Sequence, residues 1–335
     1  MFCNTSEIDR AIYLKLTNDC QLCCAHCYNA FMHNKQYISD QVLDKAILYI
    51  KNTINQYSND HFVVQLHGGE PMLYDTNKIN HIIDCLPNID FTITTNLVFK
   101  LNSEKILLLQ RMKVNGLNII QTSWDYAIRF KNDKQQQLWL NNCKKLIECG
   151  VTVQPTITLT NKLINNIKPY DLINQFKGWG FTTINFERLT ETGRAQENNL
   201  RPNNRELDEY CLQLYKASKT IGLNVALFEG IEQSIKHNYV GCRTRNCNNT
   251  VTTINPDGSI SHCPNIANYP TTTIIPIKNI KLYDTKAQDK LEKNNPMQCL
   301  SCRYYQYCRG DCYQLHFDDT GCNGLKMIYD YLLAR

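Results

Sequence analysis

Short apolar runs alternate six times with amphipathic stretches between Ala11 and about residue 220, and this alternation constrains the fold more than any other feature. The runs are rich in β-branched and aromatic residues and predict strands. They cover positions 11–17, 62–66, 91–95, 117–122, 151–157 and 181–186. Between them, apolar residues recur on one helical face, as at Val42, Ala46 and Ile50. Repeated strand–helix units predict an α/β fold with a parallel sheet covered by helices.

Two details fit this pattern less well. Pro155 lies within the fifth expected strand and predicts an edge strand or a bulge there, because proline lacks the N–H that a ladder needs. The stretch 161–176, which should supply the fifth helix, shows weak helical patterning.

Three cysteines directly follow the first strand, with the spacing Cys20-x3-Cys24-x2-Cys27. Asn18 precedes them and predicts a loop. Three thiolates so close together can hold one metal centre, and they leave one corner of an iron–sulfur cube open for a cofactor or substrate. A structural zinc site that takes a distant fourth ligand fits the same spacing. Cys23 adds a second possible set, Cys20-x2-Cys23-x3-Cys27.

The triplet resembles the signature of radical S-adenosylmethionine (radical SAM) enzymes, and the six units resemble their partial (β/α)6 TIM-type barrel. This resemblance implies that Cys20, Cys24 and Cys27 hold a 4Fe–4S cluster whose fourth iron is chelated by SAM, with Cys23 as a bystander. It also implies the chemistry: the reduced cluster cleaves SAM, and the 5′-deoxyadenosyl radical removes hydrogen from a substrate C–H bond. A flavodoxin or ferredoxin is the expected electron donor.

Three loops after the expected strands resemble the SAM-binding motifs of the same family. Gly68-Gly69-Glu70 resembles the GGE motif, whose backbone holds the amino group of SAM. Ser123, in Ser-Trp-Asp, resembles the serine of Ser-Leu-Asp-Gly, and Tyr28 matches an aromatic residue beside SAM. The resemblance therefore implies cofactor contacts from these five residues.

Other loop residues receive weaker expectations. Asn96 ends the third strand, but Leu97 replaces the glycine of the family's Thr-Asn-Gly, so Asn96 is also explained by a turn. Arg129 has two interpretations, a partner for the SAM carboxylate or a solvated surface residue. The Gly193-Arg194-Ala195 loop also occurs in relatives, and no role is assigned to it.

A cysteine-rich segment follows from about residue 242. The turn signal in Asn255-Pro256-Asp257-Gly258 lies between runs 251–254 and 259–262 and predicts a hairpin. The cysteine spacing around it resembles the SPASM extension of radical SAM enzymes. The resemblance implies two auxiliary 4Fe–4S clusters, one held by Cys242, Cys247, Cys263 and Cys312 and the other by Cys299, Cys302, Cys308 and Cys322. The tail alone would equally fit two zinc knots. The expected domains are a barrel over 1–225 and a SPASM domain over 226–335.

Composition narrows the class of protein. The formal charge of +5 is mild and no Lys/Arg run forms a basic arm, so nucleic acid is not an expected partner. Residues 1–10 lack the apolar core of a signal peptide, and no run approaches about 18 apolar residues, so neither secretion nor a membrane span is expected. The seventeen cysteines are therefore expected in the cytoplasm, as metal ligands rather than disulfides.

The resemblance favours an oxidoreductase that matures peptides, forming a thioether or C–C cross-link in a ribosomally made precursor. Because the barrel begins near residue 11, any peptide-recognition module is expected on a separate protein. Formylglycine formation, as in anaerobic sulfatase maturases, is the alternative, but Pro264 stands where those enzymes have a catalytic Asp. Small-molecule dehydrogenation or epimerisation and a zinc-stabilised binding protein are the remaining hypotheses. No catalytic acid or base is assigned.

Overall fold

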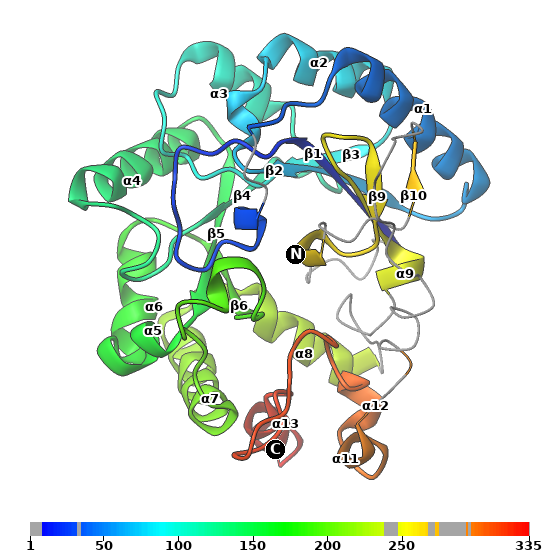
Figure 1. The fold of residues 1–335 in the computed structure, drawn as a ribbon. Coiled ribbons are helices and arrows are strands. Elements are labelled where there is room, and N and C mark those ends of the chain that lie inside the picture. The colour runs from blue at the N-terminus through cyan, green and yellow to red at the C-terminus, as the bar shows by residue number, and fades with distance from the viewer. Residues whose placement is uncertain are drawn as a thin grey trace.

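Six parallel strands and their helical crossovers curve around a central space in the computed structural model (Figure 1). The structure describes residues 9–31, 35–237, 247–266, 272–274, 293 and 296–334. Cys3 and the expected ligand Cys242 lie outside these residues. The six strands are β1 (Arg10–Thr17), β2 (Phe62–Gly68), β3 (Asp90–Ile93), β4 (Ile119–Ser123), β5 (Thr152–Leu159) and β6 (Thr183–Arg188).

The strands pair in chain order. β1 pairs with β2, β2 with β3, β4 with β5 and β5 with β6, all parallel. A single parallel bridge between Thr94 and Gln121 joins β3 to β4. Beyond β6 the sheet gains the short strand β7 (Asn224–Val225), and within the described part of the chain the sheet does not close. The expected partial barrel is confirmed.

Helices cover the outer face of the sheet (Figure 1). Their N-terminal residues explain where most begin, since six N-cap side chains accept a hydrogen bond from the first turn. The caps are Ser39, Asp75, Asn102, Asn132, Thr160 and Asn203. The helices are α1 (Asp40–Gln56), α2 (Thr76–Cys85), α3 (Ser103–Gln110), α4 (Asp133–Glu148), α5 (Asn161–Asn166), α6 (Pro169–Gly178) and α7 (Asn204–Ile221).

The two irregular stretches have structural explanations. The expectation of an edge or bulge at Pro155 is wrong, because β5 is a central strand in continuous register with β4, and Pro155 pairs with Thr122. Pairing with β6 begins only at Thr156, so the missing N–H of Pro155 removes no bond from that ladder. The weakly patterned stretch 161–176 is two helices, α5 and α6, separated where Ile167 adopts an extended conformation.

The C-terminal part extends the same sheet. The expected hairpin is present as β8 (Val251–Ile254) and β9 (Ser259–Ser261), with Gly258 in the turn at a φ of +83°. β8 pairs in parallel with β1 on the side away from β2, which the sequence pattern did not indicate. The other elements are β10 (Thr272–Thr273), α8 (Ala226–His237), α9 (Cys247–Thr250), α11 (Met297–Leu300), α12 (Tyr305–Cys308) and α13 (Lys326–Leu333).

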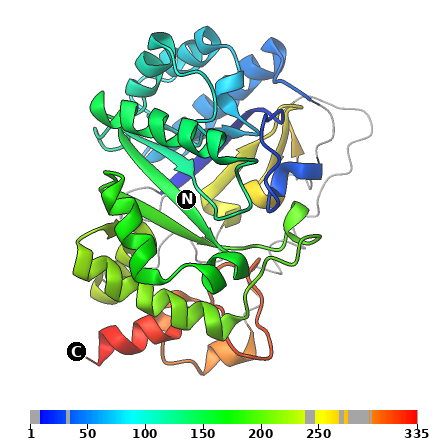
Figure 2. The ribbon, with the colours of Figure 1, turned by 90° about the vertical axis from the view of Figure 1, so that its left-hand side faces the viewer.

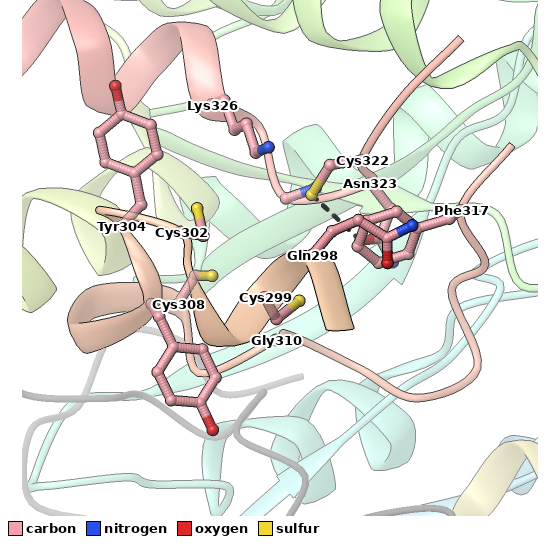
Figure 3. Close-up of a pocket in the computed structure, with 12 residues that line it drawn as sticks. Gln298, Cys299, Cys302, Tyr304, Cys308, Gly310, Phe317, Cys322, Asn323 and Lys326 are labelled. Carbon is pink, nitrogen blue, oxygen red and sulfur yellow. Dashed lines mark hydrogen bonds between the residues drawn. The ribbon is translucent and has the colours of Figure 1, made fainter. Parts of the chain in front are cut away.

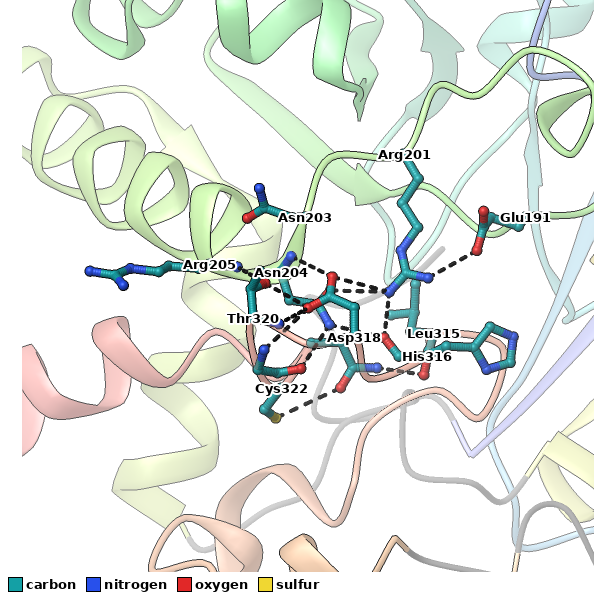
Figure 4. Close-up of polar contacts among 12 residues, drawn as sticks. Glu191, Arg201, Asn203, Asn204, Arg205, Leu315, His316, Asp318, Thr320 and Cys322 are labelled. Carbon is teal, nitrogen blue, oxygen red and sulfur yellow. Dashed lines mark hydrogen bonds and ion pairs between the residues drawn. The ribbon is translucent and has the colours of Figure 1, made fainter.

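The last segments lie at one end of the barrel, beside α7 (Figure 2). A polar network joins the loop 313–323 to the beginning of α7 (Figure 4). The backbone N–H of Asn204 donates to Asp318 at 2.8 Å, and its side chain donates to the carbonyls of His316 and Gly321, both at 3.0 Å. Arg201 contacts the carbonyl of His316 as well. The loop that carries Cys322 is therefore fastened to the barrel by side-chain contacts.

Candidate active site

A cavity of about 540 Å³ opens at the carboxyl ends of the strands. Most of the residues expected to bind a metal or cofactor there do line it. They are Cys20, Cys24, Cys27 and Tyr28 after β1, Gly68 and Gly69 at the end of β2, and Ser123 at the end of β4. The volume lies within the range of about 300–1,000 Å³ that holds cofactors and drug-sized ligands.

The three cysteines of the first loop face this cavity together. Cys24 is buried and Cys20 and Cys27 are half-buried. Burial raises the pKa of Cys20 to about 12, and the charges of Cys24 and Cys27 add to that effect. Although Arg129 lies on the same cavity wall, burial and mutual repulsion disfavour three thiolates, and a bound metal centre would supply further positive charge. Cys23 is exposed and does not line the cavity; its sulfur lies 2.9 Å from an Arg194 nitrogen.

Close backbone packing explains why the second loop needs two glycines. A Cβ on Gly68 would lie 2.1 Å from the carbonyl oxygen of Thr17, and Gly68 has a φ of +136°. A Cβ on Gly69 would lie 2.2 Å from the carbonyl oxygen of Asp19. No larger residue fits without moving the cysteine loop. Because these glycines have no side chains, the end of β2 packs directly against the loop that carries the triplet.

Glu70 has a different position from the two glycines. It is completely buried, does not line the cavity, and accepts hydrogen bonds from the Thr95 hydroxyl (2.7 Å) and the Asn96 N–H (2.6 Å). Its side chain thereby places Asn96, whose amide nitrogen lies 3.6 Å from the Cys20 sulfur. Leu97 follows with a φ of +53°, a left-handed backbone conformation that glycine adopts more readily.

Arg129 belongs to a buried charge cluster and is not a solvated surface residue. Its Nε donates to Asp125 at 2.7 Å, and His26 Nε2 lies 3.4 Å from the same carboxylate. Asp125 also accepts the N–H of Thr158 at 2.7 Å. Burial alone would raise the pKa of Asp125, but the neighbouring His26, the charge of Arg129 and the hydrogen bond from Thr158 outweigh it and hold that pKa below its ordinary value. Arg129 is thus a fixed cation on the cavity wall.

A second buried cluster was missed in the sequence. Lys15 of β1 is 1% exposed, and its ammonium donates to the Asn29 side chain and to the carbonyl of Pro264, both at 3.0 Å. Burial lowers the pKa of Lys15 to about 7. Beside it, the Tyr28 hydroxyl lies 3.2 Å from His67 Nδ1, and burial lowers the pKa of His67 to about 3. The position of Lys15 inside the apolar run 11–17 could have indicated this buried cluster.

Four tail cysteines line one small pocket, namely Cys299, Cys302, Cys308 and Cys322 (Figure 3). Gly324 packs against them, since a Cβ there would lie 3.1 Å from the Cys322 sulfur. Burial raises the pKa of Cys308 to about 12, and the charges of Asp311, Cys322 and Cys299 act in the same direction. The pocket gathers the four sulfur ligands of one expected set.

The other expected set is described only in part. Cys312 lines the large cavity, and its pKa is raised to about 12 by burial and by the charge of Cys263. Cys247 and Cys263 both lie within electrostatic range of Tyr313. Cys242 is outside the described residues. Among the residues that the structure describes, no three His, Cys, Asp or Glu side chains close on a single metal-ion position.

The fold and this site define a class, an enzyme scaffold of the partial β/α-barrel type with a thiol loop at its open end. Residues 14–166 match the Radical SAM superfamily. These residues therefore form a radical SAM domain, and the chemistry of radical SAM enzymes requires SAM and a 4Fe–4S cluster.

Comparisons with individual proteins extend the match. An uncharacterised protein of Methanocaldococcus jannaschii is 28% identical over 215 residues, which are 61% of this chain and 70% of that protein. The structure of anSMEcpe with bound AdoMet and a Cp18Cys peptide covers 97% of both chains with a TM-score of 0.74 at 15% identity. Streptococcus suis SuiB bound to the precursor peptide SuiA covers 93% of this chain and 73% of its own, with a TM-score of 0.62 at 17% identity. These two structures share the fold.

Within the described residues, no helix is both long and apolar enough to cross a membrane.

Proposed function

We propose that this chain is a radical SAM oxidoreductase that matures a ribosomally made peptide, leaving an oxidised residue or a thioether or C–C cross-link. One observation carries the proposal: a single cavity is lined by the cysteine triplet, by the expected SAM-binding loops and by Cys312 of the tail. A substrate in that cavity would lie between the first cluster site and an auxiliary site.

The ligand assignments follow the cavities. Cys20, Cys24 and Cys27 would hold the cluster that binds SAM, and the four cysteines of the small pocket would hold one auxiliary cluster. The remaining auxiliary cluster would use Cys247, Cys263 and Cys312, with Cys242 as its fourth ligand. When bound, the first cluster and SAM supply a radical that removes hydrogen from a substrate carbon.

The chain's own residues would then bind and orient SAM. The backbone at Gly68, Gly69 and Glu70 would hold its amino group, and both glycines lie on the cavity wall. Arg129 would pair with the SAM carboxylate. Its hydrogen bond to Asp125 uses Nε, so its terminal nitrogens would face that carboxylate. Ser123 and Tyr28 would complete the contacts from the cavity wall.

The peptide substrate class rests on the fold relatives. Both anSMEcpe and SuiB have been solved with a bound peptide. Formylglycine formation is the second candidate, and Pro264 counts against it because no carboxylate stands there; its carbonyl instead accepts the Lys15 ammonium. Small-molecule dehydrogenation or epimerisation is a third candidate. The non-enzyme alternative, a zinc-stabilised binding protein, is tested by colour, because iron–sulfur clusters are brown.

The surroundings of the reaction complete the proposal. The barrel would span residues 1–225 and the SPASM domain 226–335. A flavodoxin or ferredoxin would supply the first electron in the cytoplasm. The formal charge of +5 is too small to suggest nucleic acid as a partner.

The decisive experiment uses the anaerobically reconstituted protein with dithionite and SAM. 5′-Deoxyadenosine release and peptide mass are followed with short peptides encoded beside the gene and with a sulfatase-type peptide. A neighbouring peptide that loses about two hydrogens supports the proposal. Reaction of the sulfatase-type peptide alone supports formylglycine formation, and SAM cleavage with every peptide unchanged favours a small-molecule substrate.

A cysteine variant tests the ligand assignment separately. Changing Cys20, Cys24 and Cys27 together to Ala should abolish SAM cleavage while the tail retains roughly eight iron atoms, as two 4Fe–4S clusters require. Retained SAM cleavage in this variant would contradict the assignment of the triplet.

A further inference from the structure

Arg188 is the last residue of β6, and its side chain is only 2% exposed. One terminal nitrogen donates to the carbonyl of Asn323 at 2.6 Å, and the other donates to the Asp311 carboxylate at 2.8 Å. Its Nε is buried and has no hydrogen-bond partner among the described residues. A buried guanidinium therefore sits where the barrel meets the C-terminal loops.

The two partners of Arg188 adjoin cysteines of different sets. Asp311 precedes Cys312 and accepts its N–H at 2.6 Å. Asn323 follows Cys322 and donates to the carbonyl of Leu315 at 2.6 Å. Arg188 itself lines the large cavity together with Cys312, whereas Cys322 lines the small pocket. One side chain thus connects both proposed auxiliary sites to the cavity.

Arg188 carries a positive charge on the wall of the cavity that Cys312 also lines. Asp311 pairs with this guanidinium at 2.7 Å, so removal of Arg188 would leave a largely buried negative charge next to Cys312. Charges interact more strongly in a buried, low-dielectric region than in water. Reduction of an iron–sulfur cluster adds negative charge, so a buried cation nearby stabilises the reduced state, and net charge and hydrogen bonding are what set such potentials.

We propose that Arg188 is a positioning residue for both auxiliary sites, which holds the Cys312 and Cys322 loops at the end of β6 and raises the reduction potentials of the clusters there. This inference rests on the proposed function, because it needs clusters in the tail. A raised potential would make these clusters better acceptors for an electron that leaves the substrate.

The test uses the full chain with Cys20, Cys24 and Cys27 changed to Ala, so that all EPR signals come from the tail. Arg188→Gln, Arg188→Lys and the control Arg201→Gln are compared by iron content and EPR-monitored redox titration. Arg201 fastens the same loop through the His316 carbonyl and also pairs with Glu191 at 2.9 Å. It therefore controls for loop anchoring alone.

We expect Arg188→Gln to retain iron and to lower the midpoint potential of at least one auxiliary cluster by about 59 mV. For one electron, this shift is a tenfold change in the reduction equilibrium. Arg188→Lys should show a smaller shift because it keeps the charge, and Arg201→Gln should show none. If Arg188→Gln loses iron, restoration of iron by Arg188→Lys supports the inference and failure to restore it overturns it.

Unchanged potentials in Arg188→Gln, or an equal shift in Arg201→Gln, would overturn the role of the charge. Absence of tail iron in the parent variant is a separate failure, visible before any change at Arg188. It would overturn the auxiliary sites of the proposed function, and this inference with them.

Discussion

Asp125 and Arg129 form an ion pair of 2.7 Å beside the cysteine triplet, four residues apart in the chain. The carboxylate side chain is completely buried and the guanidinium side chain is 12% exposed. The pair also has His26 on its other side, 3.4 Å from the carboxylate. A cation in the cavity wall is thereby held in one orientation by a partner that substrate or solvent cannot reach.

Removing the buried carboxylate should destabilise the protein strongly. Asp125→Ala leaves Arg129 buried without its partner, and we expect a loss of about 3–5 kcal/mol in the free energy of unfolding. Urea unfolding under anaerobic conditions measures it. The control is Glu209→Ala, which breaks an exposed pair with Arg205, also four residues apart and 3.0 Å long. That change should cost about 0.5 kcal/mol or less, and equal effects of the two variants would contradict the distinction.

The glycine loop predicts a difference between two alanine substitutions. Gly69→Ala places a Cβ 2.2 Å from the backbone oxygen of Asp19, so the cysteine loop must move. We expect SAM affinity, measured by equilibrium dialysis, to fall at least about tenfold, or about 1.4 kcal/mol. Gly178→Ala meets no atom within 4 Å and should leave affinity unchanged. Wild-type affinity in Gly69→Ala would exclude the loop from the SAM site.

The small cysteine pocket predicts a separation of two activities. Cys302→Ala removes one ligand of the proposed second auxiliary cluster, so product formation should stop while some SAM cleavage continues. 5′-Deoxyadenosine and product are quantified in the same reaction. Cys85→Ala, at a half-buried cysteine of α2, should leave both unchanged. Normal product yield from Cys302→Ala would show that this cluster is dispensable.

The contact between α7 and α13 predicts a pH dependence of stability. Asp208 accepts the N–H of Met327 at 3.2 Å, and burial, with the charge of Asp330, raises its pKa to about 6. Between about pH 4 and pH 6 the folded state holds a proton that the unfolded chain has released, so the free energy of unfolding falls as pH rises. The fall should be about 1–3 kcal/mol and should largely disappear in Asp208→Asn.

A second aspartate, Asp318, predicts the opposite dependence of stability on pH. Burial alone would raise the pKa of Asp318, but hydrogen bonds from Thr320, Asn204 and Gly321 outweigh it and lower that pKa. Its contribution to stability is present above the pKa of the unfolded chain and is lost as pH falls through the folded pKa. Asp318→Asn should therefore lower the free energy of unfolding most at neutral pH. Thermal unfolding from about pH 2 to about pH 8 compares the two variants, because the Asp318 contribution is lost only below about pH 4.

Local patterns predicted the scaffold and the composition of the site. β-branched runs became β1 to β6, and the turn at Asn255 became the β8–β9 hairpin. The triplet and the two glycines met in one cavity because the carboxyl ends of parallel strands share one edge. The same reasoning failed at Pro155. The residues of β5 do not show that its pairing with β6 begins only at Thr156, after the proline.

What the sequence alone determined was the order of strands and helices and the spacing of sulfur ligands, because both depend on residues a few positions apart. Only the tertiary structure decided which distant charges meet. Arg188 and Asp311 are 123 positions apart, and Lys15 and Pro264 are 249 apart. Their contacts depend on how β8 extends the sheet beside β1 and how the last loops dock on α7. A buried charge requires a partner, and the complete fold selects that partner.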